Sequence, residues 1–177
     1  MIANGIFLSK LIYLIQLWGG CQQYLLTFLQ KLQNKAARHV TKRNVFTPVK
    51  DLLTQCGWLS VKQLIVYHNL LQIFKTKTTG RPSHLHKKFS WDFGANMGAA
   101  KSGNIKIDTR IKSDLGLNNF TFVAANQWNQ LPINIRNSDK ITSFKCHTKK
   151  WIMDNVAISW FSILFLDNEV NLCNIYI

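Results

Sequence analysis

The chain has 177 residues, of which 47% are hydrophobic, so it is long enough for one domain or one and a half and too apolar for wholesale disorder. Its 22 lysines and arginines outnumber 8 acidic residues, which gives a formal charge of +14. Such an excess costs self-repulsion in a compact fold, so its expected use is to meet a polyanion. Nucleic acid is the first candidate partner and an anionic membrane surface is the second.

Two apolar stretches have too little length or the wrong flanks for a membrane segment. The first 17 residues lack a basic start and a clear cleavage site, and Lys10 interrupts them, so a signal peptide is not favoured. The apolar run at 156–166 has 11 residues, fewer than the ~20 that a membrane-spanning helix needs. We therefore expect an intracellular protein, in the nucleus or the cytoplasm, and not a secreted one.

Residues 24–40 are predicted to form an amphipathic helix. Apolar side chains recur there at three- and four-residue spacing and are expected to share the buried face: Leu25, Phe28, Leu29, Leu32, Ala36 and Val40. Lys31, Lys35, Arg38 and Lys42 recur at the same spacing, about a quarter-turn or more from the centre of that stripe. Like charges without an acidic partner repel one another, so polyanion contact is favoured over a merely solvated face. These four cations, with Arg43 after them, are the first candidate phosphate ligands.

The next segment is predicted to contain two helices. Pro48 suits the first turn of a short helix that ends at Gly57. Ser60 is expected to cap a longer helix over 61–74. The inner face of this longer helix is expected to hold Leu64, Tyr67, Leu70, Leu71 and Phe74. His68 and Asn69 fall on the opposite side, where His68 is interpreted as a surface residue and not a catalytic one.

Residues 76–112 differ in character from the helices before them. Their first part, up to Phe89, is polar, basic and broken by Gly80 and Pro82, which predicts a loop. Alternating apolar and polar residues at 105–108 predict one short strand or hairpin. The second group of candidate phosphate ligands lies in and before this loop: Lys75, Lys77, Arg81, Lys87 and Lys88. Because loop lysines are often only solvated, this group ranks below the helical row. Arg110 is equally well explained by a phosphate contact and by an ion pair with Asp108 or Asp114.

Two asparagines at 118–119 offer an N-cap for a helix over 120–130, and Pro132 stops it. The inner face of this helix is expected to hold Phe120, Ala124, Trp128 and Leu131. Trp128 is therefore interpreted as a core residue rather than a base-stacking one. Asn129 points roughly the other way, where it could contact nucleic acid or only water. A last basic helix is expected over 139–150.

No motif in the sequence predicts catalysis. The eight acids are scattered, whereas a two-metal site needs carboxylates that converge to hold two ions ~4 Å apart. Glycine-rich phosphate and dinucleotide loops, H-E-x-x-H and G-x-S-x-G are all missing from the sequence. The four cysteines form no C-x-x-C pair, which favours buried free thiols over a disulfide scaffold or a zinc ribbon. We expect a non-catalytic binding module with no cofactor, no metal and no small-molecule substrate.

Five segments follow one another in a recognisable order: LIYLIQLWGGCQQYLLTFLQKLQNKAARHVT, LLTQCGWLSVKQLIVYHNLLQIFK, RPSHLHKKF, TRIKSDL and FTFVAANQWNQLPINIRNSDKITSFKCHTKKWI. Over about residues 12–152, their order and spacing resemble the region after the catalytic palm in reverse transcriptases of non-LTR (LINE-type) retrotransposons, in particular jockey-like elements. That region is the thumb and the sequence after it. The resemblance implies a mostly helical element that lies against a template–primer duplex beside the palm.

The resemblance also implies a parent RNA-directed DNA polymerase whose Mg²⁺-binding aspartates lie upstream, in a Tyr/Phe-x-Asp-Asp motif that this chain lacks. We therefore expect a truncated, non-catalytic remnant that begins just after the palm. Its partners would be an RNA–DNA or DNA duplex, bound irrespective of sequence, and the missing palm and fingers. The alternatives are a structural or interaction protein, membrane-associated through its apolar ends, and a remnant with no independent function.

The expected fold is mainly α, a small helical, thumb-like bundle with a basic loop and one short strand or hairpin. The sequence divides into four parts: a helical thumb-like region at 1–78, a basic Gly-containing loop or hairpin region at 79–118, C-terminal helices at 119–155 and an apolar tail at 156–177. This tail has no lysine or arginine and departs from the family pattern.

Overall fold

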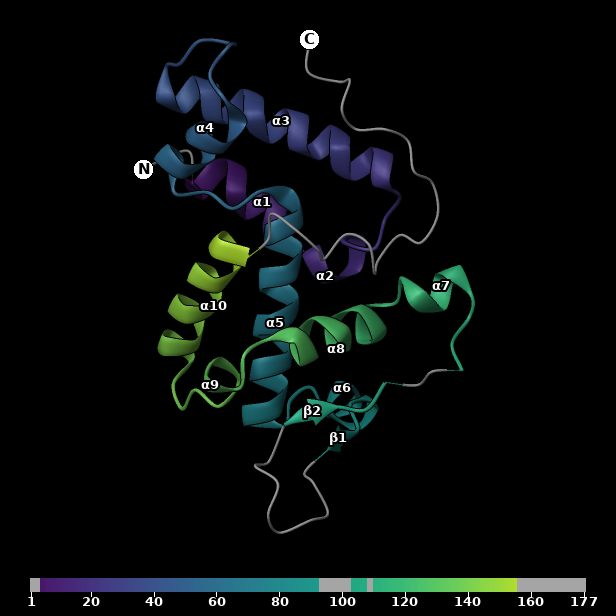
Figure 1. The fold of residues 1–177 in the computed structure, drawn as a ribbon. Helices are drawn as coiled ribbons and strands as arrows, with labels where there is room; N and C mark the ends of the chain where they lie inside the picture. Colours follow the sequence, from purple (N-terminus) through teal and green to yellow (C-terminus); the bar gives the residue numbers. More distant parts are fainter. Residues whose placement is uncertain (1–3, 93–102, 108–109, 156–177) are drawn as a thin grey trace.

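The computed structural model describes residues 4–92, 103–107 and 110–155, and this part of the chain is mainly helical, as predicted (Figure 1). The elements are a π-helical turn η1 (Asn4–Leu8), α1 (Ser9–Ile12), α2 (Ile15–Trp18), α3 (Gln23–Thr41), α4 (Val49–Cys56), α5 (Val61–Thr79), α6 (Ser83–Lys88), β1 (Trp91–Asp92), β2 (Asn104–Ile105), α7 (Asp114–Leu117), α8 (Phe120–Gln130), α9 (Ile133–Arg136) and α10 (Ile141–Asn155). The two short strands pair antiparallel, with Trp91 opposite Ile105. The predicted apolar tail at 156–177 lies outside the described residues.

Helix α5 forms the centre of the fold, with α8 and α10 packed along it and α1, α2 and α3 near its N-terminal end (Figure 1). Ten of its 19 residues are buried, and they lie all round the helix. The predicted single inner face is therefore too narrow, because a helix enclosed by neighbours buries every side. Asn69, predicted to lie opposite the inner face, is only 3% exposed, and His68 is half-buried.

One hydrophobic core contains residues from three of the four regions into which the sequence is divided above. Ile15, Phe89 and Ile152 all belong to it, although they come from the predicted regions 1–78, 79–118 and 119–155. The rings of Phe74 and Phe144 stack inside it with their centroids 4.2 Å apart. These three regions therefore fold against one another and share their stabilising contacts.

Several helix ends lie where local signals predict them. Ser60 accepts a hydrogen bond from the backbone N–H of Gln63, whose side chain in turn accepts one from Ser60, which completes a capping box on α5. Asn119 caps α8 by accepting from the Thr121 backbone, and α8 has the predicted bounds. Gly57 ends α4 in the left-handed conformation, with φ of 67°.

The loop predicted over 76–89 is wrong for most of its length, because α5 continues to Thr79 and α6 covers Ser83–Lys88. Within the extended helix, the hydroxyls of Thr78 and Thr79 donate to the carbonyls of Phe74 and Lys75 one turn earlier, at 2.9 and 2.7 Å. Gly80, with φ of 65°, then ends the helix. The cations of this segment are therefore displayed largely on helices.

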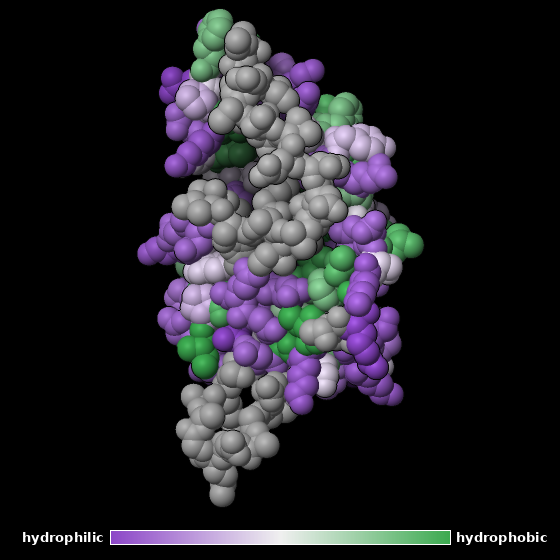
Figure 2. All heavy atoms as spheres, turned by 45° about the vertical axis from the view of Figure 1, so that its right-hand side comes forward, coloured by the Kyte–Doolittle hydropathy of each residue, from purple (hydrophilic) through white to green (hydrophobic). Residues whose placement is uncertain are grey.

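A smaller apolar cluster lies between α3 and α4, away from the main core. It consists of Ala37, Leu52, Leu53 and Trp58. The ring of Phe7, from η1, stacks on Trp58 with the centroids 5.8 Å apart. This cluster positions α3 at one end of the molecule. Polar side chains predominate on the face drawn in Figure 2, and separate apolar patches reach the surface there.

Candidate nucleic-acid interface

Polar side chains dock α3 on the start of α5. The Gln33 amide, fully buried, donates to the carbonyl of Leu59 at 2.8 Å. The Gln30 side chain accepts from the backbone N–H of Val61 at 2.9 Å. Together with Leu26 and Ala37, these glutamines define the buried face of α3. Hydrogen bonds to the Leu59 carbonyl, just before α5, and to the Val61 N–H, which the α5 N-terminus leaves free, thus determine which way the helix faces.

The buried face predicted for this helix is wrong for four of its six residues, whereas Leu29 and Ala36 are half-buried and pack against the apolar clusters. The exposed fractions are 40% for Leu25, 58% for Phe28, 38% for Leu32 and 48% for Val40. The true buried face lies roughly 100° round the helix from these residues. The periodicity was correct as an apolar stripe, but the amides of Gln30 and Gln33 turn the helix so that this stripe, which we call the α3 apolar stripe, faces outward.

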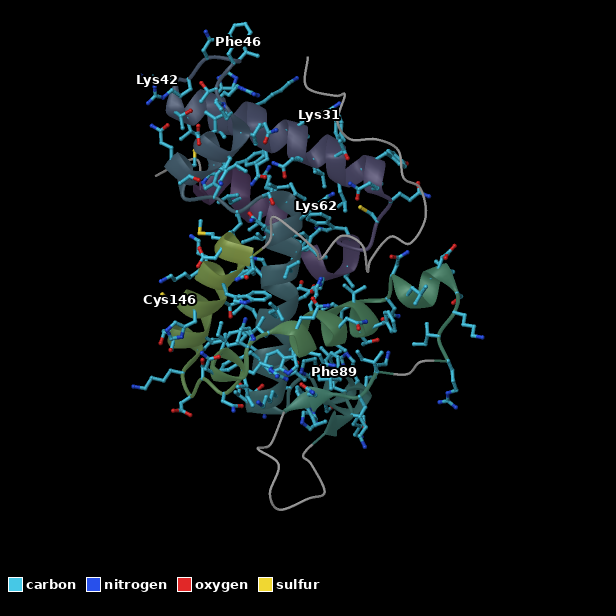
Figure 3. All side chains as sticks on the ribbon, viewed as in Figure 1. Lys31, Lys42, Phe46, Lys62, Phe89 and Cys146 are labelled. Carbon is cyan, nitrogen blue, oxygen red and sulfur yellow. The ribbon has the colours of Figure 1, made fainter. Side chains whose placement is uncertain are left out.

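Lysines project from α3 on the side away from the fold. Lys31 and Lys35 are exposed and lie roughly 160° round the helix from the buried face. Lys42 caps the end of α3 with a left-handed φ of 53°, and Arg43 follows it, both exposed. Figure 3 shows Lys31 and Lys42 well separated along α3. We call these four residues the α3 cation row, and no aspartate or glutamate occurs in the first 50 residues of the sequence.

Arg38, predicted to belong to the cation row, has a different position. It is half-buried, and its guanidinium donates to the carbonyl of Val45 at 3.3 Å. Arg38 therefore orders the turn between α3 and α4. At the tip of this turn Phe46 is 90% exposed, and it lies at the same end of α3 as Lys42 (Figure 3).

The second group of predicted phosphate ligands separates into two kinds. Those exposed to solvent are Lys75, Arg81, Lys87 and Lys88, on or between α5 and α6. Lys77 is half-buried: its ammonium donates to the Arg136 carbonyl at 3.4 Å and lies 5.4 Å from the Trp128 ring centroid. Burial and the nearby Arg136 charge lower the pKa of Lys77. Lys77 therefore supports the core and is not a free surface cation.

Arg110 is exposed, and Asp108, one of its two expected ion-pair partners, lies outside the described residues. The structure thus places the cations of the two groups on separate elements. The α3 cation row is the set whose exposed members lie on α3 or directly after its end.

Asn129, for which a contact with nucleic acid or only with water was predicted, is half-buried and bonds to the protein backbone. Its amide both donates to the Ile105 carbonyl and accepts from the Ile105 N–H, each at 2.8 Å. Trp128 is fully buried, as predicted, and its indole N–H donates to the Gly103 carbonyl at 2.9 Å. Both side chains are used to attach β2 to α8, a role that only the tertiary fold reveals.

Three cysteines can be placed, and all carry free thiols. Cys21 and Cys56 are half-buried, and burial raises the pKa of both. Cys146 is exposed on α10, so the expectation of a buried thiol is wrong there (Figure 3). Cys173 lies outside the described residues. Among residues 4–92, 103–107 and 110–155, no group of three or more His, Cys, Asp or Glu side chains has the geometry to hold a metal ion.

In the part of the chain that the structure describes, no helix has the length and apolar character to cross a membrane. No family model matches the chain, and neither a curated protein nor a solved structure matches it.

Proposed function

We propose that the chain is a non-catalytic nucleic-acid-binding module, derived from the thumb of a non-LTR retrotransposon reverse transcriptase, that binds the phosphates of a duplex irrespective of sequence. The observation that carries the proposal is the α3 cation row. It displays Lys31, Lys35, Lys42 and Arg43 outward, in a stretch of sequence without a single acid. Backbone phosphates are the partners that such a row suits, because phosphate contacts fix position without reading bases.

The length of the row is compatible with a duplex. Lys31 and Lys42 are 11 residues apart, which corresponds to roughly 16 Å along a helix. Successive phosphates of one strand rise about 3.4 Å along the duplex axis, so the row spans several of them. The α3 apolar stripe lies beside the row.

A salt titration tests the proposal. Binding of an RNA–DNA duplex and of a DNA duplex would be followed by fluorescence anisotropy over a range of salt concentrations, for the wild type and for Lys31→Gln/Lys35→Gln/Lys42→Gln. Arg38 is kept, since its loss would disturb the turn after α3. The matched control is Lys140→Gln/Lys145→Gln/Lys150→Gln, which removes three exposed charges from or next to α10. Both variants have a formal charge of +11, since 14 − 3 = 11.

We expect the α3 variant to bind at least tenfold more weakly and to lose about 2.7 from the slope of log K against log salt, because each phosphate contact contributes about 0.9. The control variant should keep most of the wild-type affinity and most of the wild-type salt slope. Equal losses in the two variants would mean that net charge alone drives binding, and would contradict the assignment to α3. A non-cooperative thermal melt of the wild type would instead favour a remnant with no independent function.

A second candidate function is association with an anionic membrane surface. The specific observation is that exposed Phe28 and Leu32 lie beside the cation row, with Phe46 90% exposed at its end. Exposed apolar residues next to lysines are typical of helices that lie in the membrane interface. Flotation with phosphatidylserine vesicles would test it, with Phe28→Ser/Phe46→Ser as the variant. If the wild type floats and this variant does not, while duplex binding is equal in both, the membrane function is supported.

A further inference from the structure

A cavity of about 630 Å³ lies between α5 and α8, and residues of α2, α3, α6 and α7 complete its wall. Figure 1 shows α2, α6, α7 and α8 on one side of α5. Pockets that hold small molecules have volumes of about 300–1,000 Å³. The wall is mostly apolar and includes Leu26, Ile65, Val66, Leu85, Phe120 and Val123. The α3 cation row contributes no residue to it, so the cavity is a separate feature of the fold.

Two buried amides line this cavity and are only partly satisfied. Asn69 and Gln127 are 3% and 2% exposed, and the Asn69 amide nitrogen donates to the Gln127 side-chain oxygen at 3.1 Å. The remaining oxygen of Asn69 and the remaining nitrogen of Gln127 have no hydrogen-bond partner in the described structure. A buried donor or acceptor that is left without a hydrogen bond costs free energy. Both atoms are enclosed by protein. The pair thus carries one unpaired acceptor and one unpaired donor in the cavity wall, and rotating both amides by half a turn leaves that combination unchanged.

Cationic side chains line the same cavity. Lys62 precedes Asn69 by seven residues, so it lies on the same side of α5, roughly 10 Å along the helix. Figure 3 shows Lys62 near the N-terminal end of α5. His84 and Lys88, one turn apart on α6, also contribute to the wall. The described wall contains no aspartate or glutamate, so this part of the cavity suits an anion.

We propose that the cavity binds a nucleotide, with the edge of the base on the Asn69–Gln127 amide pair and the phosphate near Lys62 and Lys88. A nucleobase has apolar faces and carries a donor and an acceptor side by side on its edge, as the two amides require. Its phosphate lies at the far end of the molecule from that edge, as the lysines do from the amides. A purely hydrocarbon ligand would leave both amides unsatisfied. The nucleotide comes either from solution or from an unpaired end of a strand.

Calorimetric titration of the full chain tests the proposal. The probes are the four ribonucleoside monophosphates, with adenosine as a base without phosphate, ribose 5-phosphate as a phosphate without base, and dodecyl phosphate as an apolar anion. We expect saturable binding of at least one monophosphate, at least tenfold tighter than adenosine or ribose 5-phosphate. A short single strand that binds more tightly than the monophosphate identifies a strand end as the source, and equal affinity identifies a free nucleotide. Absence of saturable nucleotide binding, or preference for dodecyl phosphate, would overturn the proposal.

Two variants locate the site. Asn69→Leu/Gln127→Leu replaces the amide pair by apolar groups, and Lys62→Gln/Lys88→Gln removes the cations. Each should weaken nucleotide binding at least tenfold, whereas Lys140→Gln/Lys150→Gln, with the same charge change, should not. In the wild type, the side-chain amide NMR signals of Asn69 and Gln127 should shift on adding nucleotide, a readout that does not depend on the folding of a variant. Unmoved amide signals in the presence of bound nucleotide would refute this placement of the base. Because no residue of the α3 cation row lines the cavity, these results are independent of those for duplex binding.

Discussion

Asn129 hydrogen-bonds both backbone groups of Ile105, donating to its carbonyl and accepting from its N–H, each at 2.8 Å. The amide thus takes the place that a neighbouring strand would occupy beside β2, which is only two residues long and pairs with β1 on its other side. The adjacent Trp128 donates to the Gly103 carbonyl at 2.9 Å. Two consecutive residues of α8 therefore attach β2 to the core.

Replacing Asn129 by Ala should loosen β2. Both bonds to Ile105 disappear and leave two backbone groups to find water, so we expect a loss of about 1–3 kcal/mol in the free energy of unfolding. The exchange of the Ile105 amide hydrogen should accelerate at the same time. Denaturant unfolding and hydrogen exchange measure the two effects. Gln130→Ala, at an exposed position in the same helix, is the control. Unchanged protection at Ile105 would show that the amide contacts do not stabilise β2.

The buried amide pair should behave non-additively. Asn69→Leu or Gln127→Leu alone leaves the other amide without its 3.1 Å partner, so each single variant should lose about 1–3 kcal/mol. The double variant replaces both polar groups and should be more stable than the sum of the two losses implies, by roughly 0.5–3 kcal/mol of coupling. Urea unfolding of the four proteins in this cycle measures the coupling. Simple additivity would contradict a direct interaction between the amides.

Local signals were sufficient for helix ends and insufficient for helix orientation. Ser60, Gly57 and Asn119 act within a few residues of their own positions, so the sequence alone predicted them correctly. The face that α3 buries depends on Gln33, which bonds a carbonyl 26 residues away. No periodicity encodes such a bond, and the apolar stripe favoured the wrong face.

The same limit applies to the candidate sites. The exposed lysines of the cation row follow from helical spacing and were predicted, whereas Arg38 departs from the row because of the Val45 carbonyl in the next turn. The cavity was not predicted at all. Asn69 and Gln127 are 58 residues apart, and each alone is an ordinary polar residue on a helix. The two amides come into contact only when α5 and α8 pack together in the folded protein.

Lys62 should make the stability of the protein depend on pH in an alkaline window. Burial lowers its pKa from 10.5 to about 8. The unfolded chain therefore holds this proton up to higher pH than the folded one, and the free energy of unfolding should rise as pH increases from about 8 to 10.5. Below that window, the folded state must carry the charge at a half-buried site. The stability gained from neutral Lys62 is thus lost as pH falls through the pKa that Lys62 has in the folded protein.

Lys62→Met removes this titration. The difference in unfolding free energy between the wild type and the variant, measured by urea unfolding at several pH values across the window, should change in favour of the wild type as pH rises. Lys50→Met, at an exposed position on α4, controls for the loss of a surface charge. Parallel curves for the wild type and Lys62→Met would show that the Lys62 ammonium keeps its ordinary pKa in the folded protein.

Gly20 is a position where the backbone of one segment meets that of another. A Cβ added there would lie 2.8 Å from the carbonyl oxygen of Asn118, which is backbone and cannot rotate away. Gly20→Ala should therefore push the turn between α7 and α8 away from the end of α2 and cost about 1–3 kcal/mol. For a domain of this size, each kcal/mol lowers Tm by about 2–4 °C.

Gly5→Ala is the matched control, because a Cβ at Gly5 has no neighbour within 4 Å among the described residues. It should leave Tm unchanged or raise it slightly by restricting the unfolded chain. Since Gly20 and Asn118 both line the cavity, Gly20→Ala should also weaken nucleotide binding. An equal effect of the two substitutions on Tm would contradict the close approach of the two segments.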